Sequence, residues 1–338
     1  MSSPPEPRSN PDLFGHDHAA AALRESALSG RMHHGWMLTG PQGVGKATLA
    51  WRYARWMLAG MPEAPIPGEA PLFVPAAAPL FARVAAGAHA DLRSLSPNTG
   101  EKGKKVLIRV EEVRELTRFL AMTPAEGGWR VVVIEDMEAM NEQAQNALLK
   151  TLEEPPPRAV LVLTASAPDR LLPTIRSRVR RLDLFPLEAP AMDSVLSRWL
   201  PDMSGDDRSA LARLAAGSPG RALLLAEGEG LSMAREVEGF LARLPRPEPR
   251  ELHALADRLT SKRDGSAFLT FFALLRDAIA GALRRAARGE SAAPWLAGRG
   301  LAEWAGLWDM LGRLADETDT LNLDRRQAVL TGLSRLSV

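Results

Sequence analysis

The sequence contains no cysteine in 338 residues. Disulfide bonds and thiolate zinc sites are therefore excluded, and the composition fits a reducing cytosol. No uninterrupted apolar run approaches the roughly 20 residues that span a bilayer. The first stretch, MSSPPEPRSNPDLFG, also lacks the apolar core of an export signal. We therefore expect a cytoplasmic protein without a membrane segment.

The net charge is also close to zero, because the sequence has 42 Lys and Arg residues and 41 Asp and Glu residues, which gives a formal charge of +1. Such a chain has no overall positive field to attract nucleic acid, so any contact with DNA must come from a local patch or from an assembly. Hydrophobic residues make up 46% and charged residues 25%, which is ordinary for globular proteins. The length suits two or three domains.

Strand-like and helix-like segments alternate up to about residue 185. Helical periodicity occurs, for example, at 110–120 and 141–152. Because strands that alternate with helices form parallel sheets covered on both faces, we expect an α/β domain with a mostly parallel sheet. Short β-branched runs predict five strands, at Trp36–Thr39, Leu92–Leu95, Val131–Ile134, Val160–Thr164 and Val179–Leu184.

After Pro186 the strand signal ends and the sequence becomes helical. The string LPRPEPR (244–250) predicts a linker, and a break follows around 289–294. The chain is thus predicted to have four parts: a flexible arm (1–13), an α/β domain (14–185), a small helical domain (186–243) and a C-terminal all-α domain (244–338). Helices are expected in the third part at 191–200, at 206–216 and from Arg221 onward.

The strongest local signal is GPQGVGKA (40–47), which follows a predicted strand and precedes a helical segment. This spacing is that of a P-loop, with ordinary Gly-rich turns as the alternative. Gly40, Gly43 and Gly45 would let backbone N–H groups converge on phosphate oxygens. The helix N-terminus adds positive potential, and Lys46 adds a charge.

The loop lacks the hydroxyl that completes a magnesium site. P-loops end in Ser or Thr, which ligates Mg²⁺, whereas this chain has Ala47. Thr48 comes one residue late and, on a helix, points about 100° away. Two interpretations stay open: the loop still binds ATP, or it descends from a P-loop and no longer binds a nucleotide. Efficient hydrolysis is not expected in either case.

Two carboxylates follow the strand at 131–134 in the order Glu135-Asp136. Nucleotide hydrolases place Asp before Glu here, one to hold Mg²⁺ and one to orient water, so each side chain has the wrong length for its task. A residual metal role and a solvated or helix-capping role both stay open. With Ala47, these residues predict a degenerate ATP site made of Gly40, Gly43, Gly45, Lys46, Thr48, Glu135 and Asp136.

The most specific string is NEQAQNALLKTLEEPPP (141–157). Its periodicity alone predicts an amphipathic helix ended by the diproline. As a string, residues 146–155 resemble the bacterial clamp-loader ATPase subunits of the AAA+ class, and the resemblance continues through 163–168 and 172–178. It implies a P-loop AAA+ domain with a parallel sheet, a small helical lid domain and a C-terminal all-α collar domain.

Ser177-Arg178-Val179 stands where that family has Ser-Arg-Cys. The resemblance implies that Arg178, with Ser177 beside it, projects across a subunit boundary to the γ-phosphate of ATP on a neighbour. A guanidinium is permanently charged and planar and can bind phosphate oxygens bidentately. Such an arginine finger in trans can be worth roughly 10³–10⁵ in rate. A surface ion pair near a strand start is the alternative.

Within the family, the delta-prime branch fits better than the hydrolysing tau/gamma branch. It combines an impaired nucleotide site with an intact finger, and LNLDRRQAVL (321–330) resembles its endings. The implied partners are tau/gamma and delta in a hetero-oligomeric ring, with primed DNA and the sliding clamp reached through the assembly. The alternatives are an autonomous AAA+ ATPase that uses Thr48 and a hydrolysing tau/gamma-like subunit.

The family usually carries a four-cysteine zinc module between the P-loop and the second strand. This chain has GMPEAPIPGEAPLFVPAAAP (60–79) there, followed by His89. Without thiolates a structural zinc has no ligands, and one histidine cannot replace them. We therefore expect no zinc or other bound metal, and an irregular surface excursion over 60–79.

Two arginines are predicted to contact DNA phosphates. Arg109 and Arg114 lie in IRVEEVREL (108–116), a string that is similar in the family. The lysines at 102, 104 and 105 form either a second phosphate-facing patch or a solvated hairpin tip. Phosphate contacts would make binding dependent on salt and independent of base sequence.

Overall fold

The computed structural model describes residues 5–30, 32–64, 66–97, 108–261, 265–290 and 292–337. The lysines at 102, 104 and 105 lie outside these ranges. The chain divides into two compact units, residues 1–223 and 224–338. The finer division into an arm, an α/β domain, a lid and a collar stays a prediction.

A five-stranded sheet in the order β2-β3-β4-β1-β5 forms the centre of the first unit, and every neighbouring pair is parallel. The parallel α/β prediction is confirmed, and each predicted strand end is correct to within one residue. β1, β3 and β4 are buried along their whole length, as expected for apolar strands covered on both faces. The strands are β1 (Gly35–Thr39), β2 (Leu92–Leu95), β3 (Arg130–Ile134), β4 (Ala159–Ala165) and β5 (Arg180–Asp183).

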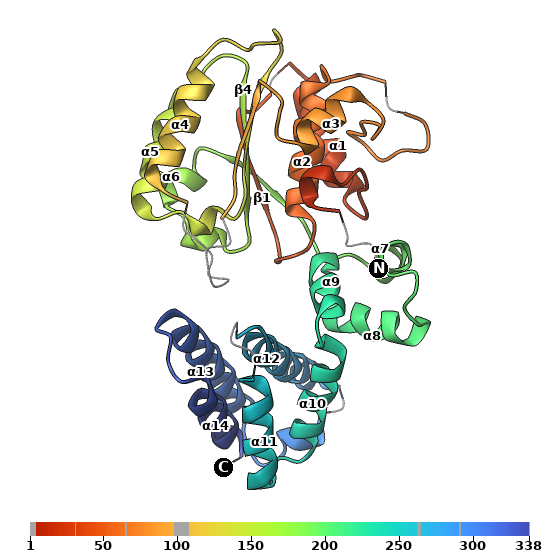
Figure 1. The fold of residues 1–338 in the computed structure, drawn as a ribbon, viewed down its shortest axis with the longest axis vertical. Coiled ribbons are helices and arrows are strands. Elements are labelled where there is room, and N and C mark those ends of the chain that lie inside the picture. Colours follow the sequence, from red (N-terminus) through yellow and green to blue (C-terminus); the bar gives the residue numbers. More distant parts are fainter. Residues whose placement is uncertain are drawn as a thin grey trace. The chain divides into compact units, whose positions relative to one another are not determined.

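Helices cover both faces of this sheet, α1 to α3 on one side and α4 to α6 on the other (Figure 1). Alternate side chains of each central strand enter opposite cores: Val131 and Val133 of β3 pack with the first group, Val132 and Ile134 with the second. The helices here are α1 (Asp17–Leu28), α2 (Lys46–Leu58), α3 (Pro79–Ala85), α4 (Val110–Ala121), α5 (Glu142–Glu153) and α6 (Pro173–Arg176).

Short elements and three further helices complete this part of the chain, and α9 runs across the boundary into the second unit. The expected helices at 191–200, at 206–216 and from Arg221 are confirmed as α7, α8 and α9. These elements are η1 (Pro7–Ser9), η2 (Met137–Ala139), η3 (Pro168–Arg170), α7 (Ala189–Trp199), α8 (Gly205–Ala215) and α9 (Pro219–Glu227).

The segment predicted as a flexible arm is hydrogen-bonded to α2 over its described residues. Arg55 donates from Nη1 to the carbonyl of Arg8 at 2.7 Å and from Nη2 to that of Asn10 at 2.6 Å. Arg52 donates from Nη1 to the carbonyl of Pro11 at 2.7 Å. Both arginine side chains are buried, and buried donors require acceptors. The arm supplies those acceptors as main-chain oxygens.

The excursion at 60–79 is irregular before α3 begins, as expected, but it does not lie wholly on the surface. Leu72 and Val74 are buried in the core that contains α2. Arg52 also donates from Nε to Pro71 O at 2.7 Å and from Nη2 to Ala70 O at 2.8 Å. One side chain of α2 thus holds the arm and the excursion together.

The second unit is helical, and the expected break at 289–294 is confirmed between α12 and η4. Among the described helices, α12 alone is long and apolar enough to cross a membrane by length and composition, with a mean hydropathy of 1.5. Its Phe268, Phe271 and Phe272 are buried beside α10 and α13, as in the core helix of a globular unit. The elements are α10 (Gly230–Ala242), α11 (Pro249–Leu259), α12 (Ser266–Ala287), η4 (Pro294–Leu296), α13 (Leu301–Thr320) and α14 (Arg325–Leu336).

Candidate functional site

The glycine-rich loop connects the end of β1 to the start of α2. Gly40, Gly43 and Gly45 have φ of 149°, 76° and 114°, a region that side chains with a Cβ rarely enter. Gly43 is also required by close packing, since an added Cβ would lie 2.8 Å from the backbone nitrogen of Arg221. The backbone itself therefore demands the three predicted glycines.

Lys46 is buried at the first position of α2, and its ammonium group lies within the loop. Its Nζ donates to the carbonyls of Gly40 and Pro41 and to Oγ of Ser166, each at 2.9 Å. An ammonium group and the N-terminus of a 13-residue helix together favour an anion at this point. Ser166 is absent from the sequence prediction. Its signal is its place directly after β4, at the carboxyl edge of the sheet, where ligands of parallel sheets bind.

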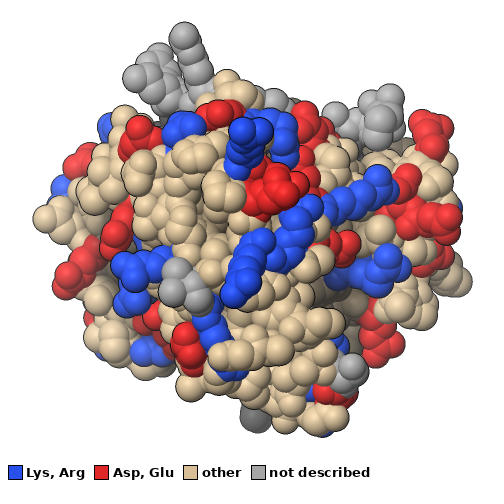
Figure 2. Space-filling model, turned by 90° about the horizontal axis from the view of Figure 1, so that it is seen from below, with Lys and Arg blue, Asp and Glu red and all other residues tan. Residues whose placement is uncertain are grey.

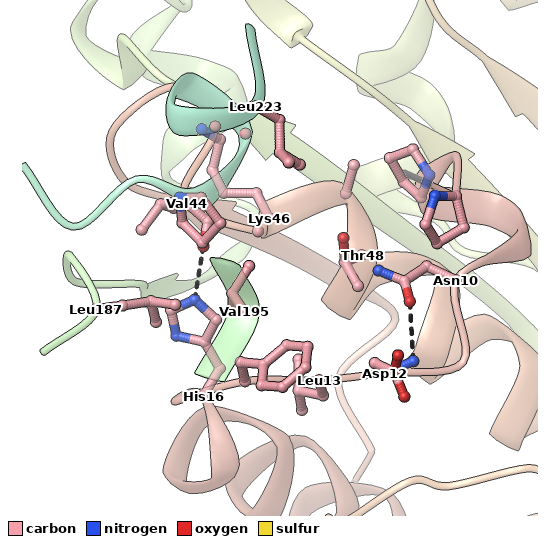
Figure 3. Close-up of a pocket in the computed structure, with 18 of the residues that line it drawn as sticks. Asn10, Asp12, Leu13, His16, Val44, Lys46, Thr48, Leu187, Val195 and Leu223 are labelled. Atoms are coloured by element: carbon pink, nitrogen blue, oxygen red, sulfur yellow. Dashed lines mark hydrogen bonds between the residues drawn. The ribbon is translucent and has the colours of Figure 1, made fainter. Parts of the chain in front are cut away.

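A cavity of about 250 Å³ lies beside the loop (Figure 3). Thr48 and Ala47 both line it, so the predicted loop and the residue that replaces the metal-binding hydroxyl face the same space. Apolar residues dominate the remaining wall, and Phe14 meets Trp199 edge to face with ring centres 5.8 Å apart. The lining residues outside the loop include Pro5, Pro7, Asn10, Leu13, Phe14, His16, Asp136, Thr164, Leu187, Val195, Trp199 and Leu223.

His16 joins α1 to the loop. Its Nε2 lies 2.8 Å from the carbonyl oxygen of Val44, and burial lowers the pKa of His16 below its ordinary value. The ring is therefore neutral at pH 7, and Nε2–H is the donor. No sequence pattern singles out His16, because its partner lies 28 residues further along the chain.

The two predicted carboxylates are separated by the structure. Oε1 of Glu135 accepts from Trp51 Nε1 at 2.7 Å, away from the cavity, and burial is the main cause that raises the pKa of Glu135. Asp136 lines the cavity, and its backbone N–H donates to Thr164 Oγ1 at 3.0 Å. Only Asp136 of the pair therefore lines the cavity.

The loop residues fit the phosphates of a nucleotide better than they fit its magnesium ion. Glycine N–H groups, Lys46 and the α2 N-terminus all favour phosphate oxygens. Ala47 offers no side-chain oxygen, and Glu135 is bound to Trp51. Within the described ranges, no group of three or more His, Cys, Asp and Glu residues could hold a metal ion.

Arg178 lies between α6 and β5, remote from this cavity. Its Nη1 donates to Thr174 O at 3.0 Å and to Ser177 Oγ at 3.3 Å, and its Nη2 pairs with Glu153. Arg178 precedes β5, whereas the loop follows β1. Since the two strands are parallel neighbours, Arg178 lies at the amino end of the strands and Lys46 at their carboxyl end. The structure does not bring the predicted finger to its own chain's loop.

Arg109 and Arg114 are exposed, at the N-cap position of α4 and on its second turn. The backbone N–H of Arg109 donates to Glu112 Oε2 at 2.7 Å, which fixes the start of the helix. Figure 2 shows a face of the molecule on which Lys and Arg side chains lie among Asp and Glu side chains, in keeping with the balanced charge. DNA contact by the two arginines stays a prediction.

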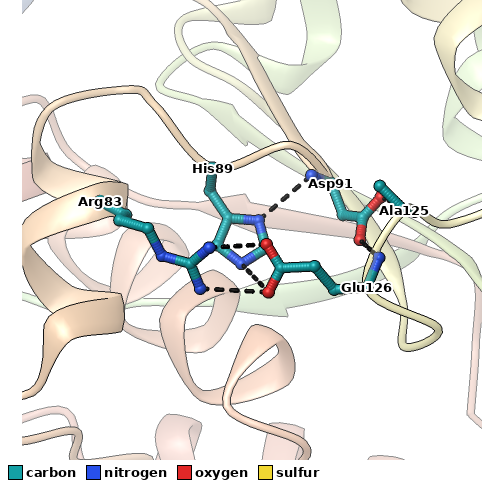
Figure 4. Close-up of polar contacts among 5 residues, drawn as sticks. All are labelled: Arg83, His89, Asp91, Ala125 and Glu126. Carbon is teal, nitrogen blue, oxygen red and sulfur yellow. Dashed lines mark hydrogen bonds and ion pairs between the residues drawn. The ribbon is translucent and has the colours of Figure 1, made fainter.

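A polar cluster includes residues that follow segment 60–79, the segment expected to lack the family's zinc module (Figure 4). Arg83 of α3 donates two hydrogen bonds to the carboxylate of Glu126, at 2.6 and 3.1 Å. Glu126 Oε2 lies 3.7 Å from Nε2 of buried His89. Asp91 accepts the backbone N–H groups of Ala125 and Glu126 at 2.7 and 2.9 Å, and its own N–H donates to His89 Nδ1. These contacts tie α3, β2 and the turn before β3 together.

The family model described as DNA polymerase III, delta subunit, matches residues 15–188. DNA polymerase III subunit delta' of Pseudomonas aeruginosa is 41% identical over 220 residues, 63% of this chain and 63% of that protein. Subunit delta' of Escherichia coli is 38% identical over 215 residues, 64% of this chain and 60% of that protein. The matched part thus spans less than two thirds of these relatives.

A weaker similarity extends to DNA polymerase III subunit tau of Escherichia coli, 28% identical over 249 residues, 70% of this chain and 36% of that protein. A solved DNA polymerase III gamma subunit-related protein from Thermotoga maritima is 19% identical, covers 94% of this chain and 98% of its own, and superposes with a TM-score of 0.49.

Proposed function

This chain belongs to the DNA polymerase III, delta subunit family, and on that premise we propose that it is a clamp-loader subunit of the replicative polymerase. It would act in the cytoplasm, in a ring with tau/gamma and delta. There it supplies Arg178 to ATP held by a neighbouring subunit while the sliding clamp is loaded on primed DNA.

The observation that carries the proposal is the position of Arg178. The side chain is 34% exposed and lies within the matched residues 15–188, next to Ser177. It lies at the amino end of the strands, whereas its own loop lies at their carboxyl end. A triphosphate that Arg178 contacts must therefore be bound to another chain. A guanidinium provides charge and planar donors for phosphate oxygens.

The chain's own nucleotide site is proposed to be degenerate. Hydrolysis requires a metal ion bridging the phosphates and a group that orients water. Ala47 removes the loop's metal ligand, and Glu135 is bound to Trp51 instead of facing the cavity. The neighbouring subunit is thus proposed to hydrolyse ATP, and this subunit is proposed to complete the neighbour's site with Arg178.

Reconstitution with tau/gamma, delta, the clamp and primed DNA tests the finger. We expect Arg178→Ala to lower the stimulated ATPase rate while the complex still assembles. Arg176→Ala is the matched control, because Arg176 lies two residues away and forms its own ion pair with Asp169 at 3.1 Å. An Arg178→Ala complex with wild-type ATPase activity would remove the finger from the proposal.

The alternative, an autonomous ATPase, rests on one observation: Thr48 lines the cavity despite its late position in the motif. The purified chain distinguishes the two functions. Appreciable ATP turnover that Lys46→Ala abolishes would support the autonomous enzyme, and absence of turnover would support the clamp-loader subunit that acts in trans.

A further inference from the structure

His34 is a half-buried residue directly before β1, and its side chain joins this strand to the end of α5. Its Nε2 lies 2.9 Å from the carbonyl oxygen of Leu152, 118 residues further along the chain. Burial is the main cause that lowers the pKa of His34, so the ring is neutral at pH 7. Because a carbonyl oxygen can only accept, Nε2–H is the donor. The carbonyl oxygen of His34 accepts the N–H of Leu161 at 2.7 Å, which fixes its backbone against β4.

The sequence after α5 explains why a side chain must supply this donor. The last carbonyl groups of a helix have no partner within the helix. In a continued helix, the carbonyl oxygen of Leu152 would accept the N–H of residue 156. Residues 155–157 are prolines, which have no N–H. His34 therefore provides the hydrogen bond that the chain beyond α5 cannot.

The same helix end carries an acceptor for Arg178. Glu153 follows Leu152 as the last residue of α5, and its Oε1 lies 2.8 Å from Nη2 of Arg178. The contacts of Arg178 with Thr174 and Ser177 come from the turn that directly precedes it. Among these described contacts, the one with Glu153 alone relates the guanidinium to another element of the fold.

Gly35 brings the start of β1 close to both parts. An added Cβ at position 35 would lie 3.2 Å from Leu152 Cδ2 and 3.3 Å from Val179 Cγ1. It would also lie 3.7 Å from the carbonyl oxygen of Arg178. Close-packed interiors transmit small displacements. The position of the α5 end is therefore coupled to the strand start that His34 and Gly35 form.

We propose that His34 is a positioning residue for Arg178. Its hydrogen bond to Leu152 fixes the end of α5 and thereby the carboxylate of Glu153, which aligns the guanidinium toward a triphosphate on a neighbouring subunit. This role rests on the proposed function, since it requires that Arg178 acts in trans. Because the nucleotide is bound by the neighbour, loss of the hydrogen bond should affect turnover more than nucleotide affinity.

Two amide substitutions test the position of the donor. The amide nitrogen of glutamine can reach the place of the ring Nε2, whereas that of asparagine ends near the place of Nδ1. In a complex reconstituted with tau/gamma, delta, the clamp and primed DNA, His34→Asn should lower the stimulated kcat about three-fold with little change in KM, because one hydrogen bond is lost. His34→Gln should retain the wild-type rate.

His33→Asn is the matched control. His33 stacks on His34 with ring centres 4.7 Å apart, but its Nδ1 contacts Gly35, only two residues away. Asparagine can keep that local contact, so the ATPase rate should not change. In the isolated chain, amide hydrogen exchange at residues 150–154 should be faster in His34→Asn than in wild type and His34→Gln. This measurement reports on the α5 end without involving the trans contact.

The double variant separates positioning from a general effect on folding. In the Arg178→Ala background, His34→Asn should not lower kcat further, and a further loss would show that His34 acts by another route. Wild-type kcat in His34→Asn, beside an impaired Arg178→Ala complex, would overturn the inference and leave the arginine finger standing. Unchanged exchange at residues 150–154 would also overturn it. Wild-type activity of the Arg178→Ala complex would instead remove the proposed finger, and the role of His34 with it.

Discussion

Arg178 and Glu153 form an ion pair in which Nη2 lies 2.8 Å from Oε1. Glu153 is the last residue of α5, the helix whose sequence carries the family resemblance. Together with the carbonyl of Thr174 and Oγ of Ser177, it orients the plane of the guanidinium. Nε–H of Arg178 has no partner among the described residues, which leaves a donor for phosphate.

This pair predicts a small effect on rate. In a reconstituted complex, Glu153→Ala should lower the stimulated kcat by up to about five-fold with little change in KM, because an exposed ion pair is worth about 0–1 kcal/mol. Glu153→Gln, which keeps an acceptor oxygen, should retain most of the activity. The measurement is steady-state ATPase kinetics.

The control for that prediction is the double variant. In the Arg178→Ala background, Glu153→Ala should not lower the ATPase rate further. Asp169→Asn, which breaks the neighbouring Arg176 pair, should leave the ATPase rate unchanged in the wild-type and the Arg178→Ala background. A loss that persists without Arg178 would show that Glu153 acts by another route.

Removal of Arg55 should destabilise the first unit. The side chain is 2% exposed and donates to two main-chain carbonyls, so Arg55→Ala leaves two acceptors without partners. We expect the free energy of unfolding to fall by about 2–4 kcal/mol, measured by urea denaturation, and faster proteolysis after Arg8. Arg118→Ala, at an exposed site on α4, should change neither.

Acidification should destabilise the fold through His89. Burial lowers the pKa of His89 below 6.5 in the folded state, so the unfolded chain binds more protons between that lower value and 6.5. Protonation of His89 therefore leaves the free energy of unfolding unchanged above pH 6.5 and lowers it as the pH falls toward the folded pKa. The stability difference between pH 7.5 and 5.5, measured by denaturation, should shrink in His89→Gln.

His18→Gln serves as the comparison, since His18 is exposed. It should keep the wild-type pH dependence. His16 and His34 also have lowered pKa values because of burial, so part of the dependence should remain in His89→Gln. An identical slope in His89→Gln and wild type would contradict the assignment to His89.

Restoring a hydroxyl should restore magnesium dependence without restoring turnover. Ala47 lines the cavity at the first turn of α2. In Ala47→Thr, ATP should bind several-fold more tightly with Mg²⁺ than with EDTA, and we expect no ATP hydrolysis because Glu135 remains bound to Trp51. Calorimetry and phosphate release measure the two effects. Equal affinities in Mg²⁺ and EDTA would contradict the assigned role of position 47.

The sequence by itself determined the sheet, the helices around it and the glycine loop. β-branched runs and helical periodicity are local signals, and glycine is the residue that adopts the positive φ of positions 43 and 45 at little steric cost. It also determined that position 47 offers no side-chain oxygen to a metal ion, because alanine has none.

Only the tertiary structure decided which way the polar side chains point. Glu135 and Asp136 are adjacent in sequence, yet one is bound to Trp51 and the other faces the cavity. The arm looks flexible by composition but provides acceptors for Arg52 and Arg55, more than 40 residues away. The need to satisfy buried donors is a property of the packed chain, and no local pattern encodes it.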